Sequence, residues 1–444
     1  MMVPRERLVL WTGVVGASCV LAAAAEPRWA LPAAAAGALS AAVVLLDAWV
    51  SRGRLAGLRL RFPGDVRLTC GRPGEVELLV DGSSCGLRRL RLALAWPAGF
   101  APERRVMEVA LPGDAPGRLL WPCMADRRGR HSIAFARAET PSRLGFWDVR
   151  RSLPLDQPVR VYPDLSAERR GMAAVFLNRG LAGVHVRRMV GKGREVEKLR
   201  EYLPGDSYED IHWKATARRA RPVTKSYQIE RSQEVYVVMD TSRLSARPAS
   251  ETGDGGGPPL LDRFITAALL LGMVAGRQGD LFGVAAFDDR VRAFVRAGGG
   301  PGHHAVVRDA VFALAPAPVN PDFGELCAFL RLRLRRRALV ILLTSLDDPV
   351  LSEEFVRNME PVFRKHLVLV NTPVPPGVGR LFSEQAREGE DLHGRLAGHY
   401  RWRQLRELEF ALRRRGVGLQ MLDDARMCPQ MAAQYLGARQ RQLL

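Results

Sequence analysis

The chain has 444 residues, of which 47% are hydrophobic and 25% charged, values typical of globular proteins. At about 150 residues per domain this length predicts two or three domains, and the composition excludes a small disulfide-stapled fold, a disordered chain and a polytopic transporter. Lys and Arg outnumber Asp and Glu by 66 to 47, and the resulting net charge of +19 favours an anionic partner such as a membrane surface or nucleic acid.

Two uncharged apolar runs, residues 8–25 and 29–46, stand near the N-terminus and are separated by a three-residue turn. Each run is near the lower limit for crossing a bilayer about 30 Å thick. A cleaved signal peptide is the rival interpretation of the first run, but the second run directly after it favours a helical hairpin. Arginines lie outside the hairpin, so we expect both termini in the cytoplasm. Residues 1–54 are therefore predicted to be two transmembrane helices of a cell-membrane protein.

Short apolar segments alternate with Gly/Pro turns from residue 55 to 165 and predict β-strands at 58–62, 66–70, 75–80, 87–96, 105–111, 131–138 and 158–162. Strands at this spacing are typical of a β-sandwich, here expected to be immunoglobulin-like. The segment carries no catalytic constellation. Residues 166–233 follow as a connecting segment.

Residues 234–444 alternate between strand and helix patterns, with expected strands at 234–239, 280–287, 338–343, 366–371 and 417–422. Apolar strand runs between helices predict an α/β domain with a doubly wound, mostly parallel sheet. Ligand sites of such sheets lie at the carboxyl ends of the strands. This rule singles out two groups of polar residues: Asp240, Thr241 and Ser242 after the first strand, and Thr344, Ser345, Asp347 and Asp348 after a later one.

The densest polar segment, residues 198–230, reads KLREYLPGDSYEDIHWKATARRARPVTKSYQIE. Three interpretations stay open for it. It forms a salt-bridge network that fixes its neighbours, it presents a recognition surface to a partner or anion, or it holds an acid/base site with His212 beside Asp206 or Asp210. The sequence supplies no nucleophile, metal cage or phosphate-binding loop to go with such a site.

These residues resemble the hallmark R-E-Y-x-P-G-D-x-x-R-x-I-x-W-K-x-x-A-R of the bacterial "domain of unknown function 58" family. The matching residues are Arg200, Glu201, Tyr202, Pro204, Gly205, Asp206, Ile211, Trp213, Lys214, Ala217 and Arg218. His212 stands at the unspecified position between Ile211 and Trp213 and is a further candidate for partner binding. Glu209 stands where the family often has Arg. The segments RRGRHSI at 127–133 and PSRLGFW at 141–147 are similar to further family motifs and occur in the expected order.

The resemblance implies a von Willebrand factor A-like domain with a metal-ion-dependent adhesion site. Such a site uses D-x-S-x-S, a distant Thr and a distant Asp, oxygen ligands that suit Mg²⁺. This chain keeps Asp240 and Ser242, but Leu244 replaces the second Ser and Ser345 stands where the distant Asp is expected. Asp347 substitutes only if the loop changes register. We therefore expect a degenerate site with no cofactor, or with weakly bound Mg²⁺.

The resemblance also implies an association with MoxR-type AAA+ ATPases in assembling or activating other proteins. The expected function is thus a membrane-anchored, non-enzymatic adaptor whose cytoplasmic von Willebrand A-like head binds a protein partner. A hydrolase or transferase that uses His212 with a nearby carboxylate is the first alternative. Nucleic-acid binding through basic stretches is the second, but the acids interleaved with them dilute the positive field, so no nucleic acid is expected.

Overall fold

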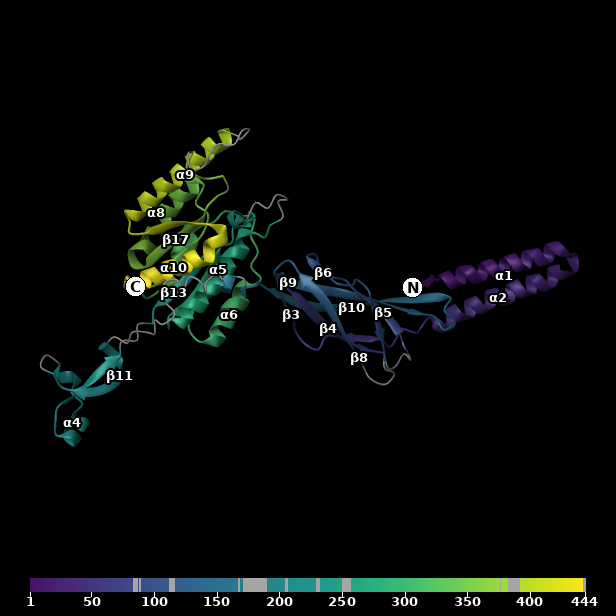
Figure 1. Cartoon of the computed structure of the whole chain (residues 1–444), viewed down its shortest axis with the longest axis horizontal. Helices are drawn as coiled ribbons and strands as arrows, with labels where there is room; N and C mark the ends of the chain where they lie inside the picture. The colour runs from purple at the N-terminus through teal and green to yellow at the C-terminus, as the bar shows by residue number, and fades with distance from the viewer. Residues whose placement is uncertain are drawn as a thin grey trace. The chain divides into compact units, whose positions relative to one another are not determined.

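The contacts of the computed structural model divide the chain into two compact units, Met1–Asp164 and Leu165–Leu444. The model describes residues 1–82, 87, 89–111, 116–166, 168–170, 190–203, 207–228, 232–249, 257–375, 377–381 and 392–441. The first unit holds two apolar helices and two β-sheets. The second holds a two-stranded hairpin and a six-stranded sheet with its helices (Figure 1).

Two long apolar helices, α1 (Glu6–Ala25) and α2 (Ala30–Ser51), form an antiparallel pair joined by a 3₁₀ turn at Pro27–Trp29 (Figure 1). Both are long and apolar enough to cross a membrane. Most of their large apolar side chains, such as Leu10 and Leu45, are exposed rather than packed inside the protein. This exposure distinguishes them from the core helices of a soluble domain. The two predicted apolar helices are therefore present, and their orientation in a membrane stays a prediction.

The rest of the first unit is a two-layer β-structure. The larger sheet has the order β1 (Met2–Pro4), β10 (Trp147–Tyr162), β9 (Gly129–Pro141), β5 (Arg89–Leu94) and β7 (Met107–Ala110), and β3 (Val66–Thr69) pairs parallel with β10. The smaller sheet has the order β2 (Arg59–Arg61), β4 (Pro73–Asp81), β8 (Gly117–Ala125) and β6 (Phe100–Pro102). Alternate residues of β4 and β8 are buried, as expected of strands with one face on a core. Trp121, Leu92 and Val159 from the two sheets share that core.

The second unit contains a six-stranded mixed sheet in the order β15 (Val291–Gly298), β14 (Leu281–Phe287), β13 (Glu234–Asp240), β16 (Leu339–Leu343), β17 (Leu367–Pro373) and β18 (Gly418–Leu422). Neighbouring strands are parallel from β14 to β18, whereas β15 runs antiparallel at the edge. Gly283 allows β15 to approach β14 closely, because a Cβ there would lie 2.7 Å from the carbonyl oxygen of Val295.

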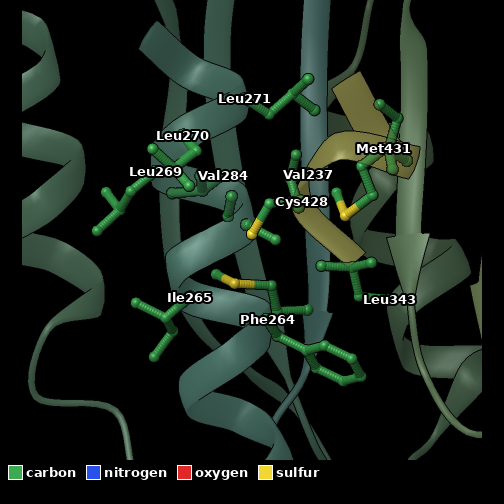
Figure 2. Close-up of a cluster of buried hydrophobic side chains, with 14 of the residues drawn as sticks. Val237, Phe264, Ile265, Leu269, Leu270, Leu271, Val284, Leu343, Cys428 and Met431 are labelled. Atoms are coloured by element: carbon green, nitrogen blue, oxygen red, sulfur yellow. The ribbon is translucent and has the colours of Figure 1, made fainter. Parts of the chain in front are cut away.

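Helices cover both faces of this sheet: α5 (Leu260–Arg277), α6 (Pro301–Val311) and α10 (Met427–Gln440) on one, and α7 (Phe323–Arg333), α8 (Pro349–Lys365) and α9 (Leu392–Arg413) on the other. The central strand β13 supplies both cores. Val237 packs with Phe264 of α5 and Met431 of α10 (Figure 2), whereas Val238 packs in the opposite core. The continuous apolar run of β13 is thus explained by burial on both faces.

Several elements differ from the sequence-based expectation. The strands β8 and β15 and the first half of β10 were not expected. The edge strand β15 carries arginines and is half-exposed, so it lacks the apolar run that marks a central strand. The segment expected to be only a connection contains a β-hairpin, β11 (Val190–Glu201) with β12 (Val223–Gln228).

Candidate functional site

The carboxyl ends of three neighbouring strands place a set of polar residues side by side. The parallel register pairs Met239 of β13 with Leu343 of β16, so the next residues, Asp240 and Thr344, lie next to each other. On the other side Asp240 pairs with Phe287 of β14, and Asp288 follows. The sheet therefore builds the strand-end site, which we define as Asp240, Ser242, Asp288 and Thr344.

Asp240 is completely buried, and both of its carboxylate oxygens accept hydrogen bonds. Oδ1 accepts the backbone N–H of Ser242 at 2.8 Å, and Oδ2 accepts the hydroxyl of Thr344 at 2.6 Å. Burial raises the pKa of Asp240, the negative charge of Asp288 adds to this rise, and the hydrogen bonds from Ser242 and Thr344 oppose it. Asp240 thus links the end of β16 to the turn that follows β13.

The hydroxyl of Ser242 is hydrogen-bonded within the turn that follows β13. Its Oγ accepts the N–H of Leu244 at 3.3 Å and caps the 3₁₀ turn Arg243–Ala246. Ser245 is also buried and donates its hydroxyl to the carbonyl oxygen of Ser242 at 2.9 Å. Backbone bonds from Ala317 to Thr241 and from Arg243 to Val319 hold this turn against a neighbouring loop.

Asp347 makes its contacts away from Asp240. Its Oδ1 accepts the hydroxyl of Ser345 at 2.7 Å, and its Oδ2 lies 3.6 Å from the guanidinium of Arg247. Asp288 is likewise committed, because Arg292 donates to both of its oxygens at 2.6 and 2.7 Å. Asp347 and Asp288 are therefore each paired with an arginine, Arg247 and Arg292 respectively.

The donor set does not fit a Mg²⁺ cage. The ion needs near-octahedral oxygen ligands, yet both oxygens of Asp240 are engaged, Leu244 offers no ligand, and the flanking carboxylates face Arg247 and Arg292. Within the described residues, no three His, Cys, Asp or Glu side chains are grouped closely enough to hold a metal ion. What the geometry does supply is a buried hydrogen-bonded latch between two strand ends.

The family-motif residues form a second candidate site, on the hairpin 198–228. In it β11 pairs with β12 in antiparallel register, Glu201 opposite Val223, and the 3₁₀ turn Tyr208–Asp210 and the short helix α4 (Trp213–Arg219) lie between the strands. Pro204, Gly205 and Asp206 lie outside the described residues.

Part of the motif closes the hairpin. His212 caps α4, since its Nδ1 accepts the backbone N–H of Ala215 at 3.1 Å. The backbone N–H of His212 donates to the carbonyl oxygen of Val223 at 2.8 Å. Ile211 is buried, and the hydroxyl of Thr216 accepts the N–H of Val223 at 3.1 Å. These bonds give His212 a structural role in which Nδ1 serves as a hydrogen-bond acceptor.

Another part of the motif faces outward. Tyr208 is 75% exposed, Trp213 is 67% exposed and Leu203 is 59% exposed, and Lys214 and Arg218 are exposed beside them in the sequence. The rings of Tyr202 and Tyr208 lie 6.1 Å apart. Arg200 donates to the carbonyl oxygen of its neighbour at 3.3 Å, and Glu201 pairs with Arg221, also at 3.3 Å. We call Leu203, Tyr208, Trp213, Lys214 and Arg218 the motif surface.

Asp288, which follows the strand expected at 280–287, is the residue of the strand-end site that sequence reasoning did not single out. Thr344 was singled out by its place, but not as the partner of Asp240. It was visible as the first residue after a predicted strand, but its pairing with Asp240 depends on which strands are neighbours. That order, in which β16 directly follows β13 across the sheet, is a property of the fold.

The comparisons with known proteins place residues 198–391 in a match to the model of the family described as "Protein of unknown function DUF58". The chain is 26% identical to "Uncharacterized protein Rv1480" of Mycobacterium tuberculosis over 198 residues, which are 44% of this chain and 60% of that protein. It is 27% identical to "Uncharacterized protein YeaD" of Bacillus subtilis over 116 residues, 26% of this chain and 28% of that protein. The family resemblance is confirmed for this segment, and the match spans only about 60% of the first relative's length.

Two solved structures are similar to part of the chain. BatB from Bacteroides thetaiotaomicron is 12% identical with a TM-score of 0.30, covering 47% of this chain and 99% of that one. An aerotolerance-related membrane protein from Bacteroides fragilis is 13% identical with a TM-score of 0.29, covering 46% and 97%.

Proposed function

We propose that the chain is a membrane-anchored, non-enzymatic interaction protein that binds a protein partner through the motif surface. The observation that carries this proposal is the exposure of Tyr208, Trp213 and Leu203 on the hairpin. Trp, Tyr and Arg dominate the binding energy of protein interfaces, and the motif surface carries an exposed Trp, an exposed Tyr and an exposed Arg. Full burial of one large apolar side chain is worth about 2 kcal/mol, a gain available only from a partner.

In this proposal α1 and α2 anchor the chain in the cell membrane with both ends in the cytoplasm. The support is the charge distribution, because Arg5, Arg7, Arg52 and Arg54 lie at the open end of the hairpin whereas the connecting turn carries Arg28 paired with Glu26. The partner suggested by the family resemblance is a MoxR-type AAA+ ATPase.

The α/β domain acts as a von Willebrand A-like head in the same proposal. The strand order with an antiparallel edge strand, and the placement of Asp240 at the end of the central strand β13, support this assignment. We propose that the strand-end site joins the ends of β13 and β16 without a metal ion, as a latch, since both carboxylate oxygens of Asp240 accept hydrogen bonds from Ser242 and Thr344. The Nδ1 atom of His212 accepts the N–H of Ala215 as a helix cap, which supports a structural role for this residue.

The test is binding of the organism's own purified MoxR-type ATPase to the full chain in detergent micelles, with and without ATP and Mg²⁺. Trp213→Ala and Tyr208→Ala are expected to weaken binding by on the order of thirtyfold each, the loss typical of an interface hot spot. Phe410→Ala is the matched control, because Phe410 is an exposed aromatic residue on α9, outside the motif surface. Equal binding by wild type and both motif variants would contradict the proposal.

A further inference from the structure

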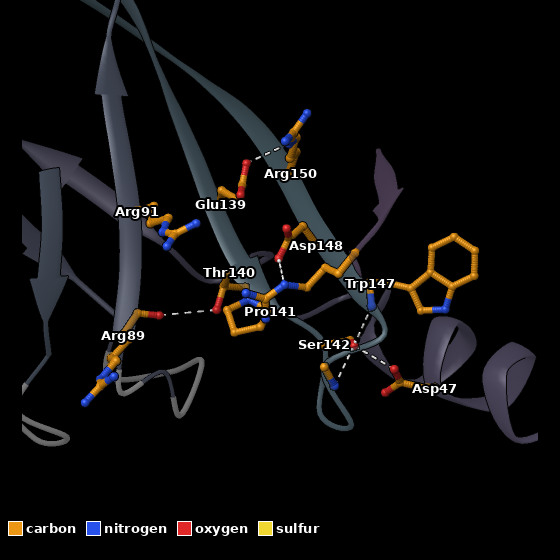
Figure 3. A network of polar contacts seen from close by, with 12 residues as sticks. Asp47, Arg89, Arg91, Glu139, Thr140, Pro141, Ser142, Trp147, Asp148 and Arg150 are labelled. Carbon is orange, nitrogen blue, oxygen red and sulfur yellow. Dashed lines mark hydrogen bonds and ion pairs between the residues drawn. The ribbon is translucent and has the colours of Figure 1, made fainter. Parts of the chain in front are cut away.

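The loop 142–147, part of the PSRLGFW segment, is tied to the last turns of α2 (Figure 3). The buried carboxylate of Asp47 accepts the hydroxyl of Ser142 at 2.6 Å through Oδ2 and the N–H of Leu144 at 3.1 Å through Oδ1. The indole N–H of Trp147 donates to the carbonyl oxygen of Val44 at 3.1 Å. The loop is thus fixed to the apolar helix pair by side-chain and backbone bonds.

These contacts set the depth of the loop relative to the apolar part of α2. Val44 belongs to the uncharged run 29–46, and Asp47 is the first charged residue after it. At 1.5 Å per residue, Val44 lies about 10 Å before the end of α2 at Ser51. If α2 crosses a membrane as proposed above, the loop lies beside the level at which hydrocarbon gives way to headgroups.

The exposed side of the loop has the composition of a membrane interface. Leu144 is 55% exposed, although it sits on a loop whose neighbours Ser142 and Gly145 are buried. The ring of Phe146 lies 5.8 Å from that of Trp11 on α1, and Trp49 near the end of α2 is exposed. Aromatic residues are enriched at this level of membrane proteins.

Three exposed arginines lie on the loop or near it: Arg143 belongs to the loop, whereas Arg7 and Arg52 belong to the ends of the helix pair. Arg7 lies against Gly145, where a Cβ would come within 3.5 Å of its guanidinium, and the N–H of Arg143 donates to the hydroxyl of Ser51 next to Arg52. Their guanidinium groups make no ion pair with any acid among the described residues. Arg5 and Arg54 differ, because Arg5 pairs with Asp148 at 3.2 Å and Arg54 donates to the carbonyl oxygen of Pro141.

We propose that the loop 142–147, together with Arg7, Arg52 and Arg143, is an interfacial binding site for anionic phospholipid headgroups. Leu144 enters the bilayer surface, and the three guanidinium groups donate hydrogen bonds to lipid phosphates. Glu6 is an exposed acid at the same end of the helices, and Asp47 and Asp148 are engaged within the protein, so positive charge prevails at the surface. The inference rests on the membrane anchoring in the proposed function and adds the lipid class that the anchor selects.

The test uses the full chain in mild detergent, incubated with phosphatidylglycerol and phosphatidylcholine in equal amounts, with bound lipid counted by native mass spectrometry. Each basic residue near an anionic surface is worth about fivefold in affinity, so replacing all three arginines by Gln is expected to weaken phosphatidylglycerol binding by on the order of a hundredfold. Replacing all three by Lys should retain most of the selectivity. Leu144→Glu should also lower phosphatidylglycerol binding, because it brings a carboxylate to the anionic surface.

Arg357→Gln is the matched control, since Arg357 is an exposed arginine on α8 in the other unit. A Gln variant that keeps the wild-type preference for phosphatidylglycerol would overturn the inference. Carbonate extraction of wild-type membranes separates this failure from that of the anchor: a chain released by carbonate refutes the membrane anchoring itself, whereas a retained chain without lipid selectivity refutes only the headgroup site.

Discussion

Replacing Asp240 tests whether the strand-end site is a latch or a metal centre. Asp240→Ala removes the acceptor of two buried donors, the N–H of Ser242 and the hydroxyl of Thr344. Each unsatisfied buried donor costs about 1–3 kcal/mol, so we expect a local destabilisation of about 3 kcal/mol. Asp240→Asn keeps one carbonyl oxygen for Ser242 and turns its amide toward the Thr344 oxygen, so its cost should stay within about 1 kcal/mol.

The pH dependence of the same site has a defined sign. Because burial raises the pKa of Asp240, the folded protein holds that proton to a higher pH than the unfolded chain, whose group titrates near 3.8. Stability from this group is therefore full below its unfolded pKa and is lost as pH rises through the folded pKa. Asp240→Asn cannot ionise and should lack this loss.

Hydrogen exchange of the amides in β13 and β16, followed by mass spectrometry on the full chain, measures both effects locally. The latch account expects faster exchange in Asp240→Ala, near wild-type exchange in Asp240→Asn, and no protection of wild type by millimolar Mg²⁺. Protection by Mg²⁺ that disappears in Asp240→Asn would refute the latch reasoning, as would an Asp240→Ala variant with unchanged exchange.

Three further predictions follow from buried polar groups. Burial, with a smaller contribution from the charge of Lys365, lowers the pKa of His366 to about 4. Neutral His366 therefore contributes its full stability above pH 6.5, and the free energy of unfolding falls by roughly 2–3 kcal/mol as the pH drops to 4. His366→Gln should flatten this pH dependence in the hydrogen-exchange rates of β17, and an unchanged pH dependence would contradict the prediction. Tyr435→Phe removes the hydroxyl that donates to buried Asp280 and should destabilise the packing of α10 by about 1–2 kcal/mol. The backbone amides of α10 should then exchange faster, and unchanged exchange would show that this hydrogen bond does not stabilise α10. Asp47→Ala removes the acceptor that holds the loop 142–147, so a protease should cleave this loop faster. Asp65→Ala is the control, because Asp65 is an exposed acid of the same unit and its replacement should leave cleavage unchanged. Equal cleavage of the two variants would show that Asp47 does not hold the loop.

The central strands were predictable because a strand that is buried on both faces has a continuous run of apolar residues. β16 is apolar throughout, and β13 is apolar between Glu234 and Asp240 at its two ends; both strands were expected within one or two residues of their observed bounds. The edge strand β15 was missed for the opposite reason. Its two arginines, Arg292 and Arg296, are exposed on one side of the strand, and short polar loops also carry such residues.

The candidate sites were predictable only in part. Asp240, Ser242 and Thr344 were each singled out from their place after a strand, but Thr344 became the partner of Asp240 through the neighbouring position of β13 and β16, which no local pattern encodes. The contacts of Asp347 with Ser345 and Arg247 depend on a loop path that the sequence does not specify. Likewise, Ile211, His212 and Trp213 are consecutive in the motif, and the contact of Ile211 with β12 leaves Ile211 buried and Trp213 exposed.

The most direct test of the central claim is site-specific photo-crosslinking in cells, with a benzophenone amino acid placed at position 213 and, separately, at position 410. Both positions carry exposed aromatic side chains, but only Trp213 belongs to the motif surface. The account predicts that the full-length, membrane-bound chain crosslinks a MoxR-type ATPase from position 213 and not from position 410. An ATPase crosslink from neither position, or from both equally, would contradict the assignment of partner binding to the motif surface.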